Sequence, residues 1–433
     1  MNKLKGFSFP TPFDLALALS AISILWATMA TMPEGEGVLS YSWQVLEYWK
    51  DGFWSLLEFT LQMVLILVFG HALAISAPVS NLLSRIASVI KSNSQAVMIT
   101  GGATLFAGYL NWGFGLILGA MLARKIGERA VAEQLEINYP LVAASGYLGM
   151  MVWHGGFSGS APLKVAEEGH FLESEIGVIP VSQTILSSFN LSINLLMILG
   201  LLLGLWLLSK KKFTFKPVQD DFSVPIEIEG KDVLGWIVGG IICVLAIGDF
   251  WSESNLNLSF ISLNYINFLL LGFGLVLHKS IQKYVLAIEM ALRGAAAIVL
   301  QFPFYAGILG VFKLSGLLVM IAGYFVTVSS PESFPLLTFF SAALINLFVP
   351  SGGGQWAVQG PVIVETALQM GLSVPKMIMV MAYGDQLTNM LQPFWALPLL
   401  AITGVAPRDL LRYTVYFFLL GLSVLILGII WAF

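Results

Sequence analysis

Three consecutive glycines at positions 352–354 are the most chemically informative feature of the sequence. Glycine has no Cβ, so a ligand can approach the backbone N–H groups closely. Where such a stretch begins a helix, its first N–H groups carry roughly half a positive charge. We therefore interpret this stretch and its neighbours as a site for a small anion such as a carboxylate. The candidate binding residues here are Ser351, Gly352, Gly353, Gly354, Gln355 and Trp356.

Neutral polar side chains in other apolar segments are candidates for the same site. An unpaired buried charge is strongly unfavourable, yet the apolar segments hold no arginine cluster that could pair with an anion. Neutral hydrogen-bond donors must then stabilise it. His154 is either one of them or a satisfied polar residue at the outer rim. The other candidates are Asn111, Trp112, Gly113, Ser158, Ser160, Thr388 and Asn389.

Asp385 lies in an otherwise apolar helix, where an ionisable residue is a functional candidate by default. An anion entering a cell that is negative inside moves against roughly 2.3 kcal/mol per 100 mV, so a cation must accompany it. We expect Asp385 to hold that cation, which is either a proton or a sodium ion. The sequence indicates no other cofactor and no metal site.

The composition indicates a membrane protein. Of the 433 residues, 57% are hydrophobic and 11% are charged, against about 25% charged residues in a soluble domain. Lipid must therefore be the main solvent, and the chain is long enough for roughly ten crossings of about 20 residues each. The net charge of −4 gives no basic excess for nucleic acid, and the single Cys243 excludes an internal disulfide.

Lysine and arginine placement predicts the topology, because short basic loops stay in the cytoplasm. Lys3 and Lys5 put the N-terminus inside, whereas the acid-rich segment 164–175 lies outside. The C-terminus is then predicted to be periplasmic, in a bacterial inner membrane; Lys376 falls outside and is an exception. The predicted spans are 13–32, 59–78, 180–208, 233–250, 261–277, 301–329 and 412–432.

Two apolar stretches fit re-entrant helical hairpins better than simple spans. Residues 95–122 return to the side that they left, and each arm is too short to cross about 30 Å at 1.5 Å per residue. Residues 334–371 repeat this pattern. The glycine-containing stretches 111–115 and 350–356 form the two predicted tips. Non-helical backbone at membrane depth persists only where it is buried in protein or lines a wet cavity, so both tips are site candidates.

Each predicted hairpin is followed by an interrupted transmembrane helix, at 139–163 and at 376–400. The extra span at 233–250 inverts the second unit relative to the first. We therefore predict an all-α polytopic membrane protein with two inverted repeats, an architecture typical of secondary carriers. The predicted parts are a first repeat at 1–208, a cytoplasmic linker at 209–232, and a connecting span with the second repeat at 233–433.

The run from Ser351 to Pro361, Ser-Gly-Gly-Gly-Gln-Trp-Ala-Val-Gln-Gly-Pro, resembles the hallmark of the short-chain fatty acid uptake family, the acetoacetate and butyrate permeases. Residues 384–393 are similar to that family and to anaerobic C4-dicarboxylate carriers, and residues 111–115 and 154–163 also look like it. The resemblance covers essentially the whole chain. It implies an ion-transporter-superfamily fold with two hairpins, often dimeric through a scaffold part, and the uptake of short monocarboxylates.

We therefore expect a secondary active importer of short-chain fatty acids, working by cation symport, rather than an enzyme. We favour the proton, because short-chain acids are already partly protonated at mildly acidic pH. A carrier of C4-dicarboxylates or another small oxyanion is the first alternative. A diacid would need a second set of donors or a buried base, and the sequence shows neither.

An intramembrane serine hydrolase is a remote alternative, suggested by the motif Gly156-Phe157-Ser158-Gly159. A serine nucleophile needs a base within hydrogen-bond reach. His154 precedes Ser158 by one helical turn, and we do not expect Asp385 to orient its imidazole ring. The motif is short and rich in glycine and serine, so chance matches in membrane helices are common.

Overall fold

Helices make up the fold, and no strand occurs in the part of the chain that the structure describes. This computed structural model describes residues 12–211, 233–252, 263–350 and 352–433. The predicted all-α fold class is confirmed. Most of the predicted linker at 209–232 and the candidate Ser351 lie outside the described residues.

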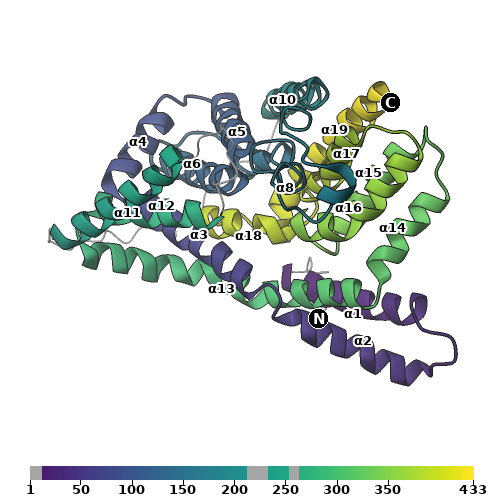
Figure 1. The fold of residues 1–433 in the computed structure, drawn as a ribbon. Coiled ribbons are helices and arrows are strands. Elements are labelled where there is room, and N and C mark those ends of the chain that lie inside the picture. The colour runs from purple at the N-terminus through teal and green to yellow at the C-terminus, as the bar shows by residue number, and fades with distance from the viewer. Residues whose placement is uncertain (1–11, 212–232, 253–262, 351) are drawn as a thin grey trace, which may run out of the picture.

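The helices form a scaffold layer and a compact core body (Figure 1). The scaffold layer comprises α1 (Pro12–Ala30), α2 (Val38–Phe53), α3 (Leu57–Ile75), α11 (Val233–Ser252), α12 (Leu263–His278) and α13 (Ile281–Leu314). The core body comprises α5 (Asn93–Leu110), α6 (Trp112–Ala132), α7 (Tyr139–Ser145), η1 (Leu148–Met151), α8 (Ser160–Lys164), α9 (Glu173–Ile176), α10 (Ser188–Ser209), α15 (Phe334–Asn346), α16 (Gly352–Gln369), α17 (Val374–Thr388), α18 (Pro393–Thr403) and α19 (Pro407–Ala432). Helices α4 (Ala77–Ser88) and α14 (Leu317–Thr327) connect the two.

Helix α13 organises the scaffold layer. Its 34 residues span about 50 Å at 1.5 Å per residue, and it packs against α1, α2 and α3. Helix α2 crosses it where Gly52 meets Gly310: a Cβ added to Gly52 would lie 2.5 Å from the Gly310 Cα. Small residues at such a crossing let two membrane helices approach closely.

The predicted span at 301–329 is not a single helix. Helix α13 continues unbroken through this region to Leu314, although Pro303 lies inside it. The chain then breaks at Gly316, whose φ of 76° is in the left-handed region, and α14 follows. The apolar run hid this break, because hydropathy does not register a single glycine in a left-handed turn.

By length and composition alone, α10 and α19 could each cross a membrane. The segments 60–73 and 77–88 pass the same test only as a pair bent by 78°. Large apolar side chains remain exposed on these and neighbouring helices, for example Leu195 at 58%, Val244 at 68% and Leu427 at 68%. Exposed apolar surface of this extent is expected where lipid is the solvent, and it is typical of a multi-pass membrane protein.

Candidate functional site

The first hairpin, α5 and α6, closes tightly at Asn111. The Phe114 N–H donates to the Asn111 Oδ1 at 3.1 Å, so this side chain caps the start of α6. A Cβ added to Gly115 would lie 2.6 Å from the Gly108 Cα, which shows how closely the two arms pack. Asn111, Trp112 and Gly113 are all buried. The backbone at this tip is therefore enclosed by protein.

The first tip also rests on the loop between η1 and α8. The Trp112 N–H donates to the Ser158 Oγ at 3.0 Å, and the Phe157 N–H donates to the Tyr109 carbonyl at 2.8 Å. The Trp112 ring lies edge-on to the Trp395 ring, with centroids 5.0 Å apart. Ser158 thus supports the first hairpin.

The second hairpin, α15 and α16, is braced from within by Gln355. Its Nε2 donates to the Ala342 carbonyl at 2.9 Å and to the Gln359 Oε1 at 2.7 Å. An amide group has only two N–H donors, so both are used inside the hairpin. In this conformation Gln355 braces the tip and has no N–H to offer an anion.

The start of α16 differs from the first tip in its surroundings. A Cβ on Gly352 would lie 2.9 Å from the His154 Cε1 and 3.0 Å from the Asp385 Oδ2, so the absence of a side chain permits this contact. A Cβ on the exposed Gly353 would meet only the Ser160 Cβ, at 3.9 Å. The tip therefore combines one glycine packed against ionisable groups with one that faces open space.

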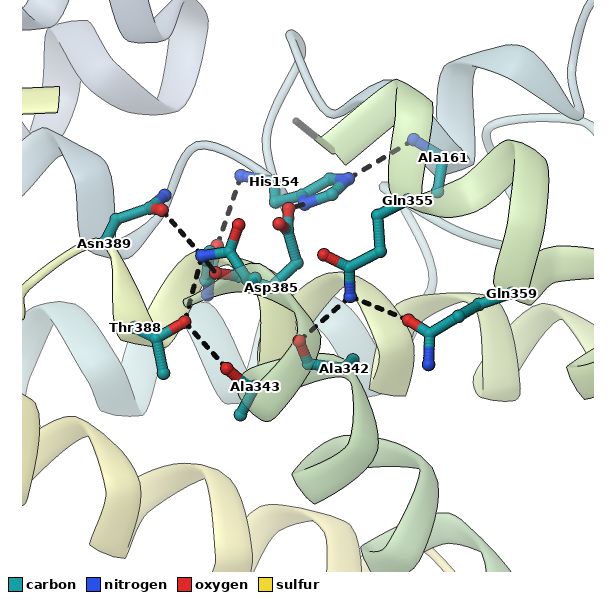
Figure 2. A network of polar contacts seen from close by, with 11 residues as sticks. His154, Ala161, Ala342, Ala343, Gln355, Gln359, Asp385, Thr388 and Asn389 are labelled. Carbon is teal, nitrogen blue, oxygen red and sulfur yellow. Dashed lines mark hydrogen bonds and ion pairs between the residues drawn. The ribbon is translucent and has the colours of Figure 1, made fainter. Parts of the chain in front are cut away.

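His154 and Asp385 form a buried pair at the centre of the site (Figure 2). The His154 Nδ1 lies 2.5 Å from the Asp385 Oδ2, and the two side chains are 0% and 1% exposed. The Ala161 N–H donates to the His154 Nε2 at 3.3 Å. A neutral ring accepting at Nε2 carries its proton on Nδ1. This nitrogen is close to the Asp385 Oδ2, although the two atoms do not meet in hydrogen-bond geometry.

The expectation that Asp385 would not orient His154 was therefore wrong. Asp385 comes from α17 in the second half of the chain, and only the folded structure brings it to His154. The pair does not complete a hydrolase site, because the His154 Nε2 already accepts from the Ala161 N–H and is not available to the Ser158 hydroxyl. His154 is fully enclosed by protein, at 0% exposed.

Three further hydrogen bonds join the two halves around this pair. The His154 N–H donates to the Gln386 Oε1 at 3.1 Å. The Tyr147 hydroxyl donates to the Asn389 carbonyl at 3.0 Å, and the Tyr383 hydroxyl donates to the Asn190 Oδ1 at 2.8 Å. The site therefore lies at a junction that neither half forms alone.

Asn346, at the end of α15, has three oxygen atoms within hydrogen-bond distance of its amide nitrogen. Its Nδ2 lies 2.7 Å from the Asp385 carbonyl, 2.9 Å from the Thr388 Oγ1 and 2.9 Å from the Asn389 Oδ1. The nitrogen has two hydrogens for these three acceptors. Helix α17 also ends here, so the carbonyl ends of two helices converge and favour positive charge.

Three buried donors near the second tip have no hydrogen-bond partner among the described residues: the Trp153 Nε1, the Trp356 Nε1 and the Asn389 Nδ2. Buried polar groups are normally paired, so each is available to a bound anion. The Trp153 ring stacks on the His154 ring, with centroids 4.4 Å apart, and would contact a side chain at Gly352. These donors lie around the His154–Asp385 pair and the second tip.

The structure thus brings together some of the sequence candidates and separates others. His154, Asp385 and Gly352 are in direct contact, and Thr388 and Asn389 join them through Asn346. Asn111 and Ser158 support the first hairpin instead. Sequence reasoning missed Asn346 and Trp153. A polar residue ending the apolar arm 334–346, and a tryptophan next to His154, were the available signals.

Comparison with known proteins identifies the relatives of the chain. A family model described as short chain fatty acid transporter matches residues 5–432. The chain is 38% identical to a protein of Escherichia coli (strain K12), over 99% of this chain and 98% of that one. It is 35% identical to a protein of Haemophilus influenzae, over 97% of this chain and 96% of that one. Each bears the name "Putative short-chain fatty acid transporter".

Two solved transporter structures also align with the structure of this chain, both at 15% sequence identity. One is the Alcanivorax borkumensis YdaH transporter, with a TM-score of 0.46 and coverage of 98% of both chains. The other is Neisseria gonorrhoeae MtrF, with a TM-score of 0.44 and coverage of 97% of this chain and 95% of that one.

Proposed function

The chain belongs to the short-chain fatty acid transporter family, and from that premise we propose that it imports monocarboxylates such as butyrate and acetoacetate by cation symport. The observation that carries the proposal is the group of buried donors without partners beside the second tip. The Asn389 Nδ2 and the Trp153 Nε1 offer hydrogen bonds to a carboxylate. The N-terminus of α16 adds its partial positive charge at Gly352 and Gly353.

A monoacid fits these donors better than a diacid. One carboxylate can be held by the α16 N-terminus and the neutral donors around it. A second carboxylate would need its own donors or a base. Among the described residues next to the tip, the ionisable pair is His154 with Asp385, and the Asp385 carboxylate would repel a second negative charge. C4-dicarboxylate carriage is the weaker alternative.

We propose that Asp385 holds the coupling cation beside the substrate. If the cation is a proton, it joins the buried carboxylate. If the cation is sodium, the oxygen atoms now gathered by Asn346 are suitable ligands, because hard cations prefer oxygen and two helix C-termini meet there. The proton remains the favoured cation, since Asp385 already contacts a group that can exchange one.

The proposed membrane arrangement places the two halves upside down relative to each other in the inner membrane, with the N-terminus inside and the C-terminus outside. The Lys376 Nζ donates to the Ala432 carbonyl at 2.9 Å, so the start of α17 and the end of α19 lie at the same level. This accounts for the exceptional lysine: it caps a helix C-terminus, where positive charge is favourable.

Cysteine labelling tests this topology in a Cys243→Ser background. A cysteine in the loop 164–175 should react with a membrane-impermeant thiol reagent in intact cells. One at Lys211 should react only after the membrane is opened. Labelling of both positions from the same side would contradict the inverted arrangement. Crosslinking of the same cells tests the homodimer that we propose from the family resemblance.

Uptake of labelled butyrate into proteoliposomes tests the function itself. An inward proton or sodium gradient should drive accumulation above the level in protein-free vesicles, which accounts for diffusion of the free acid. Unlabelled acetoacetate should compete, whereas succinate should compete poorly. Failure of both gradients to drive any protein-dependent butyrate uptake would refute the proposal.

A further inference from the structure

We propose that the His154–Asp385 pair, acting as one unit, binds the proton that drives substrate entry, and that its net charge decides whether the carboxylate binds. This rests on the proposed function and makes its coupling step specific. The pair is buried, with the His154 Nδ1 2.5 Å from the Asp385 Oδ2. At this separation a bound proton interacts with both residues, so we treat the two as one site.

The charge of the pair before the proton arrives follows from a neutral His154 and an ionised Asp385. The Ala161 N–H donates to the His154 Nε2, so the proton of the neutral ring is on Nδ1, the ring nitrogen next to the Asp385 carboxylate. This state has a net charge of −1. One further proton, on the carboxylate or shared with the ring, brings the pair to zero. The proton comes from the outside water, binds the pair and is released into the cytoplasm when the substrate leaves.

The position of the pair makes its charge matter to the substrate. Gly352 begins α16, where the anion is expected to bind, and a Cβ on it would lie 3.0 Å from the Asp385 Oδ2. A buried negative charge this near repels a carboxylate, because the low dielectric strengthens the interaction. Proton binding removes that repulsion, so proton and substrate each raise the affinity for the other.

Five other ionisable groups on the surrounding elements are engaged elsewhere. Lys164 of α8 pairs with Glu167, Tyr383 of α17 donates to Asn190, and Glu365 of α16 accepts from Gln369. Lys376 donates to the Ala432 carbonyl, and Tyr147 donates to the Asn389 carbonyl. The remaining ionisable residues on the packed elements α5 and α19 are Tyr109, Arg408, Asp409, Arg412, Tyr413 and Tyr416.

The test uses four proteins in proteoliposomes: wild type, His154→Gln, Asp385→Asn and the double variant. Butyrate exchange at equal pH on both sides reports substrate binding, and accumulation on an inward proton gradient reports coupling. In the wild type, the KM of exchange should rise by up to about tenfold per pH unit once the pair is deprotonated, as for one proton linked to one substrate. Each single substitution should move the midpoint of this profile by about one pH unit or more.

The double variant is the most informative of the four proteins, because it leaves no unpaired charge buried in the protein interior. It should exchange butyrate at the same rate at every pH and should not accumulate it on a proton gradient. The matched control is His278→Gln, since His278 is a partly buried histidine whose Nε2 contacts the Ala72 carbonyl, which glutamine can contact too. This control should keep the wild-type profile.

Several outcomes would overturn the proposal. They are a wild-type midpoint in His154→Gln, a pH-dependent KM in the double variant, or proton-driven accumulation by the double variant. Absence of butyrate exchange by the wild type would instead refute the proposed function. Proton binding by the pair can be tested without substrate. The midpoint of thermal unfolding should depend on pH differently in the wild type and the double variant. Identical dependence would refute proton binding by the pair.

Discussion

The two halves of the chain make unequal contributions to the candidate site. In the first half, the interrupted helix breaks into α7, η1 and α8, and His154 comes from the irregular loop between them. In the second half, α17 stays regular for 15 residues and carries Asp385 one turn before its end. Irregular backbone positions one partner of the pair, and a helix end positions the other.

The two hairpins also differ, in how tightly their tips are closed. The first is closed by the Asn111 cap and by glycines that bring its arms into backbone contact. The second is held together by the hydrogen bond from Gln355 to the Ala342 carbonyl, and it leaves Gly353 facing open space at its tip. The first hairpin therefore supports the site, whereas the second hairpin leaves its tip open to a ligand.

The largest expected effect is on folding, from Gly115→Ala in the first hairpin. The new Cβ would lie 2.6 Å from the Gly108 Cα, so the arms must separate. Overpacking of this kind typically costs about 1–3 kcal/mol. The midpoint of thermal unfolding and the yield should both fall. Gly102→Ala is the control in the same hairpin, because nothing lies within 4 Å of its Cβ. Equal stability of the two variants would show that the first hairpin is not closed.

Gly353→Leu in the second hairpin should abolish butyrate uptake while leaving folding near normal. A Cβ there meets only the Ser160 Cβ, at 3.9 Å, so the larger side chain extends into the space where the carboxylate approaches. Gly353→Ala should retain most activity. Wild-type uptake rates for a well-folded Gly353→Leu protein would remove this tip from the site.

Asn389→Asp should raise the KM for butyrate by roughly tenfold or more. It removes a donor, and a hydrogen bond to a charged group contributes about 1.5–3 kcal/mol. The new carboxylate can still accept from the Asn346 Nδ2, so the local structure should persist. Asn264→Asp on the scaffold layer is the matched control, since its Oδ1 also accepts from an amide, that of Gln62. A KM unchanged from the wild type would mean that Asn389 does not bind the substrate.

The smallest effects on stability are expected from two hydrogen bonds that occur in similar places in the two halves. Each interrupted helix begins with a side chain that donates to a carbonyl near the end of another helix: the Tyr139 hydroxyl to Thr403, and the Lys376 Nζ to Ala432, each at 2.9 Å. Tyr139→Phe and Lys376→Met should each lower the free energy of unfolding by about 1 kcal/mol. Butyrate uptake should not change. A loss of uptake in either variant, measured at normal protein levels, would place that residue in the transport mechanism.

The sequence predicted what depends on local pattern. Apolar runs with few charges indicated helices, and an acid in an apolar helix singled out Asp385. The contact between His154 and Asp385 was not predictable, because it joins residues from opposite halves that only the fold brings together. The role of Gln355 was also hidden: its type indicated a donor to substrate, but its neighbours in the hairpin use both N–H groups.

The roles of Asn346 and Trp153 could not be predicted from the sequence either. The sequence offered one signal for each, the polar end of the apolar arm 334–346 and a tryptophan next to His154, but neither signal indicates a contact. Their roles arise from what surrounds them: three oxygen atoms around the Asn346 Nδ2, and a buried Trp153 Nε1 without a partner among the described residues.

The most direct test of the account is whether butyrate shields the open tip of the second hairpin. A Gly353→Cys substitution in the Cys243→Ser background places a small reactive thiol at this exposed position. Saturating butyrate should slow its alkylation several-fold, and it should leave unchanged a control cysteine at Gly37, which has open space around it in the loop before α2. Equal alkylation rates with and without butyrate, in a Gly353→Cys protein that still transports it, would contradict a substrate site where the two halves meet.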